Sequence, residues 1–153
     1  MKRIFITAIF SLALIFSVTV SAMAQKQIEP KVTRDPLMEK DATGNLGVAN
    51  YYFKQKKAYL ASLKRCEEII AGNPDFSRID EVLYVAGMSS LYLAEGKGKQ
   101  KPLMKTDEDR AKYASAKLKE DAVAYLNQLV ENHPQSPFFA DAEKTLKELD
   151  PKK

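Results

Sequence analysis

The sequence predicts an all-α protein made of antiparallel helix hairpins that stack as repeats, with about two and a half units and five helices, as in a fragment of an α-solenoid. Two observations support this prediction. Apolar residues recur at helical spacing in separate segments. Two proline turns, at residues 73–77 and 133–137, each end one helix and begin the next. Because a lone hairpin leaves one apolar face uncovered, neighbouring hairpins must cover it.

Residues 1–24 have the pattern of a secretory signal peptide. Lys2 and Arg3 precede a long apolar run, and a small-x-small motif that signal peptidase accepts ends at Ala24. An uncleaved membrane anchor is the alternative, because the run is near the minimum length for spanning a bilayer. The pattern favours cleavage after Ala24, so we expect an exported, periplasmic protein.

Removal of the signal peptide would leave 129 residues (153 − 24), enough for one domain with a modest core. The signal holds two of the 24 basic residues and none of the 20 acidic ones, so the mature net charge is about +2. This balance argues against a nucleic-acid partner, whose binding domain would carry a basic surface. The single Cys excludes an internal disulfide, which suits a bacterial cell envelope.

Residues 25–45 are polar, contain two prolines and lack sustained periodicity, so they predict an N-terminal tether. The helical domain is then expected to cover residues 46–150. Its first hairpin carries apolar stripes through residues 46–53 and 59–70. Pro74 prevents the second of these helices from continuing, so the hairpin closes there.

Three further helices are expected after this hairpin. The third begins with Ser77 as its cap, and Gly87 in its middle predicts the close approach of another helix. Residues 96–106 then form a Lys-rich surface loop. Thr106, followed by three acidic residues, starts the fourth helix. Ser136, followed by proline, starts the fifth, which acts as a cap on the stack.

The hairpins also fit the tetratricopeptide pattern, which places small residues at positions 8 and 20, an aromatic residue at position 11 and proline at position 32. With Pro74 at position 32, positions 8, 11 and 20 hold Asn50, Phe53 and Ser62, respectively. With Pro134 at position 32, Gly87 and Ala122 take positions 8 and 20. The distance from position 8 to the proline is 24 residues in the first unit (74 − 50) and 47 in the second (134 − 87), which implies an insertion of 23 residues.

Two stretches of the first hairpin, VANYYF at residues 48–53 and AYLASLKR at residues 58–65, resemble a repeat of the BamD (YfiO-type) family. Two later stretches, AYLNQL at residues 124–129 and HPQSPFFA at residues 133–140, together resemble another repeat of that family. The family consists of tetratricopeptide-like subunits of the outer-membrane β-barrel assembly machinery. The resemblance covers residues 46–150 and implies protein partners in the envelope and peripheral association with outer-membrane machinery. This chain lacks the lipoprotein Cys that the family usually carries.

The sequence contains no catalytic constellation, and we predict neither enzyme activity nor a cofactor or metal site. His133 is the single His and stands at a helix end, where the helix dipole favours it. Cys66 lies on an apolar stripe, which predicts a small core residue; a reactive or intermolecularly paired thiol is the alternative. The Gly- and Lys-rich stretch at residues 96–99 lacks the spacing of a phosphate-binding loop.

A partner-binding groove is expected along the first helix of each pair, which presents positions 2, 5, 9, 12 and 13 in tetratricopeptide stacks. In this chain those positions hold Tyr51, Lys54, Tyr84, Met88, Leu91 and Tyr92. Tyr and Met are adaptable contact residues, and a lysine can pair with a carboxylate of a peptide. The alternative is that several of these residues pack against the tether or the last helix.

We therefore expect a non-enzymatic periplasmic module that binds a protein or peptide partner in outer-membrane protein assembly or related envelope biogenesis. The alternative is a structural protein that self-associates through its incomplete repeat edges or binds the cell wall through residues 96–105. The first function requires an exposed groove, and the second requires exposed edges or exposed lysines. The sequence does not predict the oligomeric state.

Overall fold

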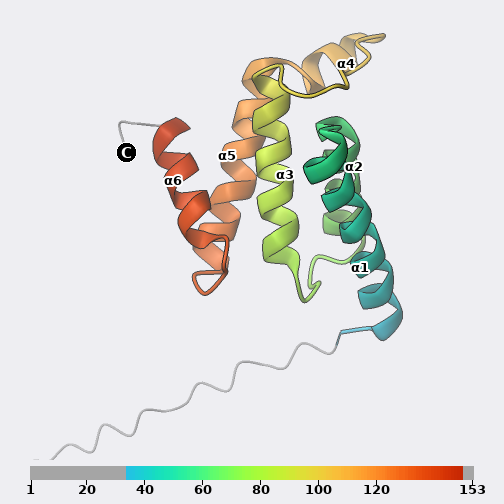
Figure 1. The fold of residues 1–153 in the computed structure, drawn as a ribbon, viewed down its shortest axis with the longest axis vertical. Coiled ribbons are helices and arrows are strands. Elements are labelled where there is room, and N and C mark those ends of the chain that lie inside the picture. The colour runs from blue at the N-terminus through green and yellow to red at the C-terminus, as the bar shows by residue number, and fades with distance from the viewer. Residues whose placement is uncertain (1–33, 150–153) are drawn as a thin grey trace, which may run out of the picture. The chain divides into compact units, whose positions relative to one another are not determined.

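The computed structural model describes residues 34–149, and this part of the chain is all-helical, as predicted (Figure 1). Its elements are α1 (Pro36–Asn50), the π-helical segment η1 (Tyr51–Lys56), α2 (Tyr59–Gly72), α3 (Ile79–Ala94), α4 (Asp107–Lys112), α5 (Ser115–Asn132) and α6 (Phe139–Leu149). None of these helices is long and apolar enough to cross a membrane. The predicted signal peptide, residues 25–33 of the predicted tether and the predicted helix stop at Asp150 lie outside the described residues.

The long helices pack side by side in chain order. α1 packs on α2, α2 on α3, α3 on α5, and α5 on α6. Figure 1 shows α3 in the middle, with α1 and α2 on one side and α5 and α6 on the other. α1 with α2 and α3 with α5 are therefore two hairpins, and α6 is a half-unit. The predicted fourth helix is divided into α4 and α5 by a break at residues 113–114, so the described part has six α-helices rather than five.

The first helix begins well before the predicted position near Leu46, because α1 already starts at Pro36. The predicted tether is therefore wrong for residues 36–45. Asp35 caps this helix: its Oδ1 accepts a hydrogen bond from the Leu37 N–H at 2.7 Å. Pro36 follows in the first turn, where its missing N–H costs nothing. Residues 36–45 bury a single apolar residue, Ala42, and hold Gly44 on the outer face, so their apolar periodicity is weak, which is why the pattern did not indicate a helix there.

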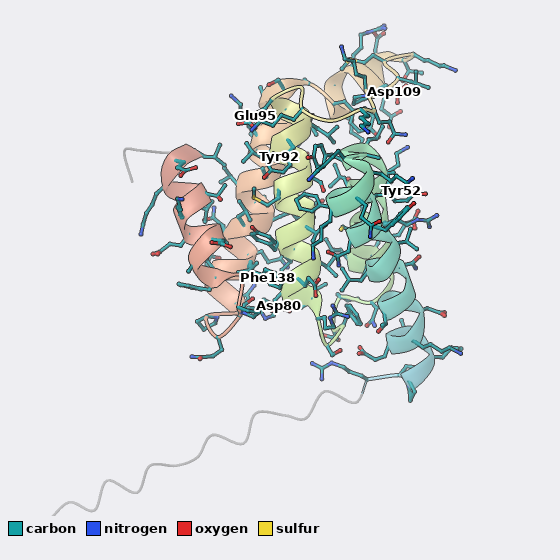
Figure 2. All side chains as sticks on the ribbon, viewed as in Figure 1. Tyr52, Asp80, Tyr92, Glu95, Asp109 and Phe138 are labelled. Carbon is teal, nitrogen blue, oxygen red and sulfur yellow. The ribbon has the colours of Figure 1, made fainter. Side chains whose placement is uncertain are left out.

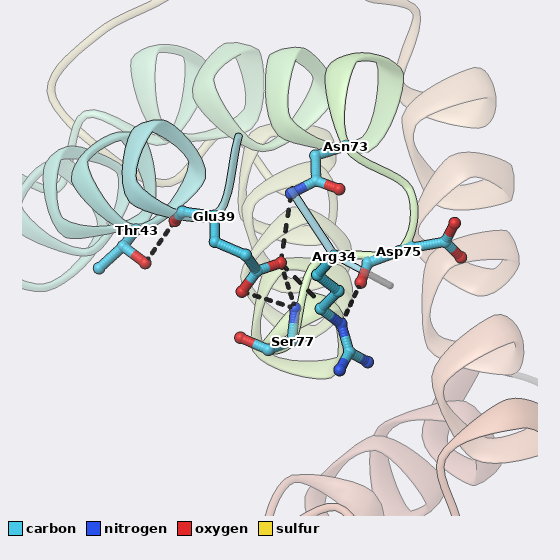
Figure 3. Close-up of polar contacts among 6 residues, drawn as sticks. All are labelled: Arg34, Glu39, Thr43, Asn73, Asp75 and Ser77. Atoms are coloured by element: carbon cyan, nitrogen blue, oxygen red, sulfur yellow. Dashed lines mark hydrogen bonds and ion pairs between the residues drawn. The ribbon is translucent and has the colours of Figure 1, made fainter. Parts of the chain in front are cut away.

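The predicted start of the third helix at Ser77 is also wrong, because α3 begins two residues later. The Ser77 N–H donates instead to the Glu39 carboxylate of α1 at 3.1 Å, and Asn73 Nδ2 donates to the same carboxylate at 3.4 Å (Figure 3). Arg34 Nε donates to the Asp75 carbonyl at 2.7 Å. The hydrogen bonds from Ser77 and Asn73 lower the pKa of Glu39. Together with the hydrogen bond from Arg34 they fasten the start of α1 to the turn between α2 and α3.

The two proline turns share one backbone geometry, which supports the internal repeat. Asn73 N–H donates to the Ile69 carbonyl at 2.8 Å, and His133 N–H donates to the Leu129 carbonyl at 2.8 Å. In each turn the carbonyl of the first residue then accepts a hydrogen bond from the N–H three residues later, at 3.1 and 2.9 Å. The turns therefore redirect the chain in the same way from α2 into α3 and from α5 into α6.

The starts of the later helices are capped by local side chains. The structure confirms that Thr106 starts a helix, and it also shows a capping box there: Thr106 Oγ1 accepts from the Asp109 N–H at 3.0 Å, and the Asp109 carboxylate accepts from the Thr106 N–H at 3.2 Å. Ser136 Oγ accepts from the Phe138 N–H at 3.1 Å and donates to Asp80 at 2.7 Å. The last helix consequently begins at Phe139, slightly later than predicted.

The core is closest packed where α3 crosses α5. Leu83, Leu126 and Leu129 are fully buried there. A Cβ placed on Gly87 would lie 2.8 Å from Leu126 Cγ, so this glycine permits the close approach of α5 that the sequence predicted. In the first hairpin, the buried Ser62 hydroxyl donates to the Ala49 carbonyl at 3.0 Å. Small residues thus set the helix spacing in both units.

Candidate interaction surface

Four of the six predicted groove residues lie together on α3. Tyr84, Met88, Leu91 and Tyr92 follow one another at helical spacing. Met88 and Leu91 cluster with Ala122 of α5, and both tyrosines pack against this cluster. We refer to these four residues as the α3 face. Met88 and Leu91 are 9 % and 7 % exposed, so only the two tyrosines present a substantial surface.

One end of the α3 face belongs to an aromatic cluster near the end of α3. Tyr92 lies near the end of α3 (Figure 2). Its ring stacks on Phe53 of η1 with centroids 5.8 Å apart and lies 4.9 Å from the Tyr59 ring. Lys97 Nζ lies 5.1 Å from the Tyr92 centroid and 2.7 Å from the Glu95 carboxylate. Lys97 donates a hydrogen bond to the Glu95 carboxylate, which raises the pKa of Lys97, so this lysine stays charged above the Tyr92 ring.

The other end of the α3 face is covered by the last hairpin turn and α6. The Tyr84 ring stacks on Phe138 with centroids 4.9 Å apart, and Thr145 Oγ1 lies 3.9 Å from Met88 Sδ. Burial raises the pKa of Tyr84, as expected for a phenol held partly away from water. Tyr84 and Met88 therefore pack against the last helix, which the sequence left open as the alternative.

Tyr51 and Lys54 lie on η1 and are exposed. The Tyr51 ring contacts the Tyr52 ring at 5.9 Å, and Lys56 Nζ lies 5.3 Å from its centroid. The η1 residue that packs against the α3 face is instead Phe53. The groove predicted from repeat positions did not include Phe53. The same repeat pattern places an aromatic residue at position 11, where Phe53 stands.

Two other chemically notable residues, Cys66 and His133, lie apart from the α3 face. Cys66 is fully buried, and burial raises the pKa of its thiol to about 12. His133 lines a polar pocket of about 320 Å³, which it shares with Arg34, Asp75 and Gln128. A second, smaller pocket of about 210 Å³ lies between α1 and α2. Within residues 34–149, no three His, Cys, Asp or Glu side chains are grouped so that they could hold a metal ion.

Comparison with known proteins gives one family. The model of a tetratricopeptide repeat family matches residues 21–146, which is most of the chain. Neither the curated proteins nor the solved structures gave a match. Domains of this repeat type are generally non-enzymatic modules for protein–protein interaction, and the two hairpins, the repeated turns and the half-unit described above have the expected architecture. The chain belongs to the tetratricopeptide repeat family.

Proposed function

We propose that this protein is an adaptor of the cell envelope, in which the α3 face and the exposed Lys54 bind a protein partner. Membership in the tetratricopeptide repeat family supports the interaction role. The signal-peptide pattern supports a periplasmic location, and the resemblance to BamD-type repeats supports a role in outer-membrane protein assembly or a related step of envelope biogenesis.

The observation that carries this proposal is the pair of half-buried tyrosines on the α3 face. Tyr84 is held by Phe138 and Tyr92 by Phe53, so both rings are oriented before a partner arrives. Ordered aromatic side chains lose little conformational entropy on binding and are enriched in binding hot spots. Lys54 adds a positive charge on the neighbouring η1.

Photo-crosslinking tests this proposal without removing core packing. Truncation of Met88 would open a cavity, whereas a photo-reactive phenylalanine analogue at Tyr84 or Tyr92 conserves the ring. We expect both positions to crosslink the same protein in intact envelopes, and Lys54→Gln to reduce the yield. The same analogue at the exposed Lys119 of α5 is the matched control. Equal yields at Lys119 and at the α3 face would contradict the proposal.

Self-association is a second candidate, and it is favoured by the outer face of the first hairpin. Leu37, Val48 and Tyr51 are large apolar residues that lie exposed along one side of α1 and η1. The outer face of α6, at the opposite end of the stack, exposes charged residues instead. Tetratricopeptide arrays need polar terminal faces to stay soluble, so an apolar one suggests a contact between copies.

Sedimentation velocity distinguishes this second candidate. If the outer face of α1 joins two copies, the exported protein should form a dimer that Val48→Glu dissociates, because a buried unpaired carboxylate is unfavourable. Lys144→Glu on the exposed face of α6 is the control and should leave the dimer intact. A wild-type protein that stays monomeric at high concentration would remove self-association.

A further inference from the structure

Positive charge is concentrated in two short segments of this chain. Residues 51–66 and 96–105 together hold nine of the 24 basic residues and none of the 20 acidic ones. The rest of the chain therefore has 15 basic residues (24 − 9) against 20 acidic ones and is net negative. Such an asymmetry creates a local positive potential that the small overall charge conceals.

The tertiary structure joins these two segments. The Lys99 N–H donates to the Lys57 carbonyl at 3.1 Å. A Cβ on Gly98 would lie 2.7 Å from the Lys57 carbonyl oxygen and 2.7 Å from the Tyr59 ring, so the loop is seated closely on the start of α2. Gly98 has a φ of +96°, a conformation that favours glycine. We call the six lysines gathered here the basic end: Lys54, Lys56, Lys57, Lys97, Lys99 and Lys101.

Exposed apolar residues accompany the basic end. Leu103 and Met104 are 69 % and 47 % exposed and follow Lys101 and Pro102 along the loop, with Lys105 after them. Tyr51, on η1, is 41 % exposed. Lysines that flank exposed leucine and methionine are typical of surfaces that lie at a membrane interface, where the charges contact lipid phosphates and the apolar side chains enter the headgroup region. Tyrosine is enriched at the same depth.

Acidic residues close to the loop reduce this positive potential without reversing it. Asp107, Glu108 and Asp109 begin α4. Asp107 is paired with Arg110, and Asp109 is engaged in the capping box. Glu95, just before the loop, is paired with Lys97 at 2.7 Å. Residues 95–112 as a whole hold six basic and four acidic residues and stay net positive. Binding of an acidic peptide would require only the lysines. Binding to a lipid surface also explains why an apolar residue, Leu103, is exposed beside them.

We propose that the basic end, together with Leu103 and Met104, binds the surface of an anionic phospholipid bilayer. The lysines would contact headgroup phosphates, and the two apolar residues would insert at the level of the headgroups. Figure 1 shows the loop and α4 together at one end of the helix stack, beyond the end of α3. Tyr84 and Met88 lie farther from this end along α3, so the contact would leave them accessible, whereas Lys54 and the Lys97–Tyr92 pair belong to both surfaces. The proposal does not depend on the adaptor role proposed above.

Vesicle co-flotation of the exported protein, with its N-terminus determined, tests the proposal. We expect binding to phosphatidylcholine vesicles that contain phosphatidylglycerol, loss of binding at high salt, and no binding to phosphatidylcholine alone. Each lysine near an anionic surface strengthens binding several-fold. Replacement of Lys57, Lys99 and Lys101 by Gln should therefore weaken binding by tenfold or more. The double substitution of Leu103→Ser and Met104→Ser should weaken vesicle binding but leave the dependence of binding on salt unchanged.

The matched control removes three charges elsewhere: Lys119, Lys144 and Lys147, all exposed, are replaced by Gln. This variant should bind vesicles nearly as well as wild type, and circular dichroism should show that both triple variants are folded. Equal loss of binding in the two triple variants would overturn the proposal. So would displacement by inorganic phosphate at constant ionic strength, or binding to polyglutamate or insoluble peptidoglycan without binding to vesicles.

Discussion

Glycines inside the helices of this protein have two different roles. Gly87 lies between α3 and α5, where an added Cβ would lie 2.8 Å from Leu126 Cγ. Gly44 lies on the outer face of α1, where an added Cβ would meet nothing within 4 Å. Glycine in a helix interior is less favourable than alanine by roughly 1 kcal/mol. At Gly87 close packing compensates for this penalty, whereas at Gly44 no contact within the molecule does so.

We expect Gly87→Ala and Gly44→Ala to have opposite effects on stability. The first should lower the free energy of unfolding, because overpacking a core costs about 1–3 kcal/mol and the gain in helix propensity is smaller. The second should raise it by roughly 0.5–1 kcal/mol. Urea unfolding followed by circular dichroism measures both. Stabilisation by both substitutions would show that Gly87 is not required for packing.

The reactivity of Cys66 provides another test at the scale of residues. The sequence predicts a core residue at this position, with a reactive thiol as the alternative. Its thiol is fully buried and its pKa is raised to about 12, so the nucleophilic thiolate is scarce near neutral pH. We expect a disulfide reagent at about pH 8 to label the folded protein very slowly and the urea-unfolded protein completely. Cys66→Ala is the blank. Rapid labelling under native conditions would restore the reactive-thiol alternative.

At the scale of elements, the start of α1 is held in place by a polar contact, whereas Ala42, Leu46 and Ala49 bury the rest of the helix in the core. The Glu39 carboxylate accepts hydrogen bonds from Ser77 and Asn73 in the turn between α2 and α3 (Figure 3). These hydrogen bonds lower its pKa below the ordinary value. The start of α1 and the first proline turn therefore stabilise each other.

This contact predicts a pH-dependent contribution to stability. Because the pKa of Glu39 is lower in the folded than in the unfolded protein, its stabilising effect is present above the unfolded pKa and is lost as the pH falls through the folded pKa. Glu39→Gln should destabilise the protein near neutral pH, and the difference from wild type should shrink as the pH falls below the ordinary pKa of glutamate. Glu120→Gln, at an exposed position on α5, is the control. A difference that does not change with pH would contradict the prediction.

The helix starts show how far local sequence goes. The capping box at Thr106 was predictable, because every group in it lies within three residues. The start of α1 at Pro36 also has a local signal, an Asp cap followed by proline. The first turns have weak apolar periodicity, so the sequence pattern did not indicate a helix there. Ser77 has the composition of a helix cap, but its N–H is used by Glu39 from another helix. Short-range signals therefore fail where a distant side chain competes for the same backbone group.

At the scale of the whole molecule, α6 closes the exposed edge of the second hairpin. Ala142 is buried against Leu83, Leu126 and Leu129, and Leu146 packs on the same cluster. Repeat arrays bury a continuous core between neighbours, so a terminal unit depends on a cap.

Truncation tests the role of this cap. A chain that ends at residue 134 should melt at a lower temperature than wild type and bind a fluorescent hydrophobic dye, because the three leucines become exposed. Removal of residues 150–153 alone is the control and should leave the melting temperature nearly unchanged. An equally stable chain ending at residue 134 would show that the two hairpins form a complete core without α6.

Helical periodicity, the two proline turns and the positions of small residues were sufficient to predict the helix-hairpin repeats, because each depends on residues close together in the chain. The exposure of the predicted groove was not predictable in this way. Met88 and Tyr84 are covered by α6 and the turn before it, Tyr92 is held by Phe53, and Tyr51 stays exposed. Likewise, the two lysine-rich segments form one surface because the loop packs closely on the start of α2, where the Lys99 N–H donates to the Lys57 carbonyl. Solvent access and charge clustering depend on which distant segments pack together, and a repeat pattern does not contain that information.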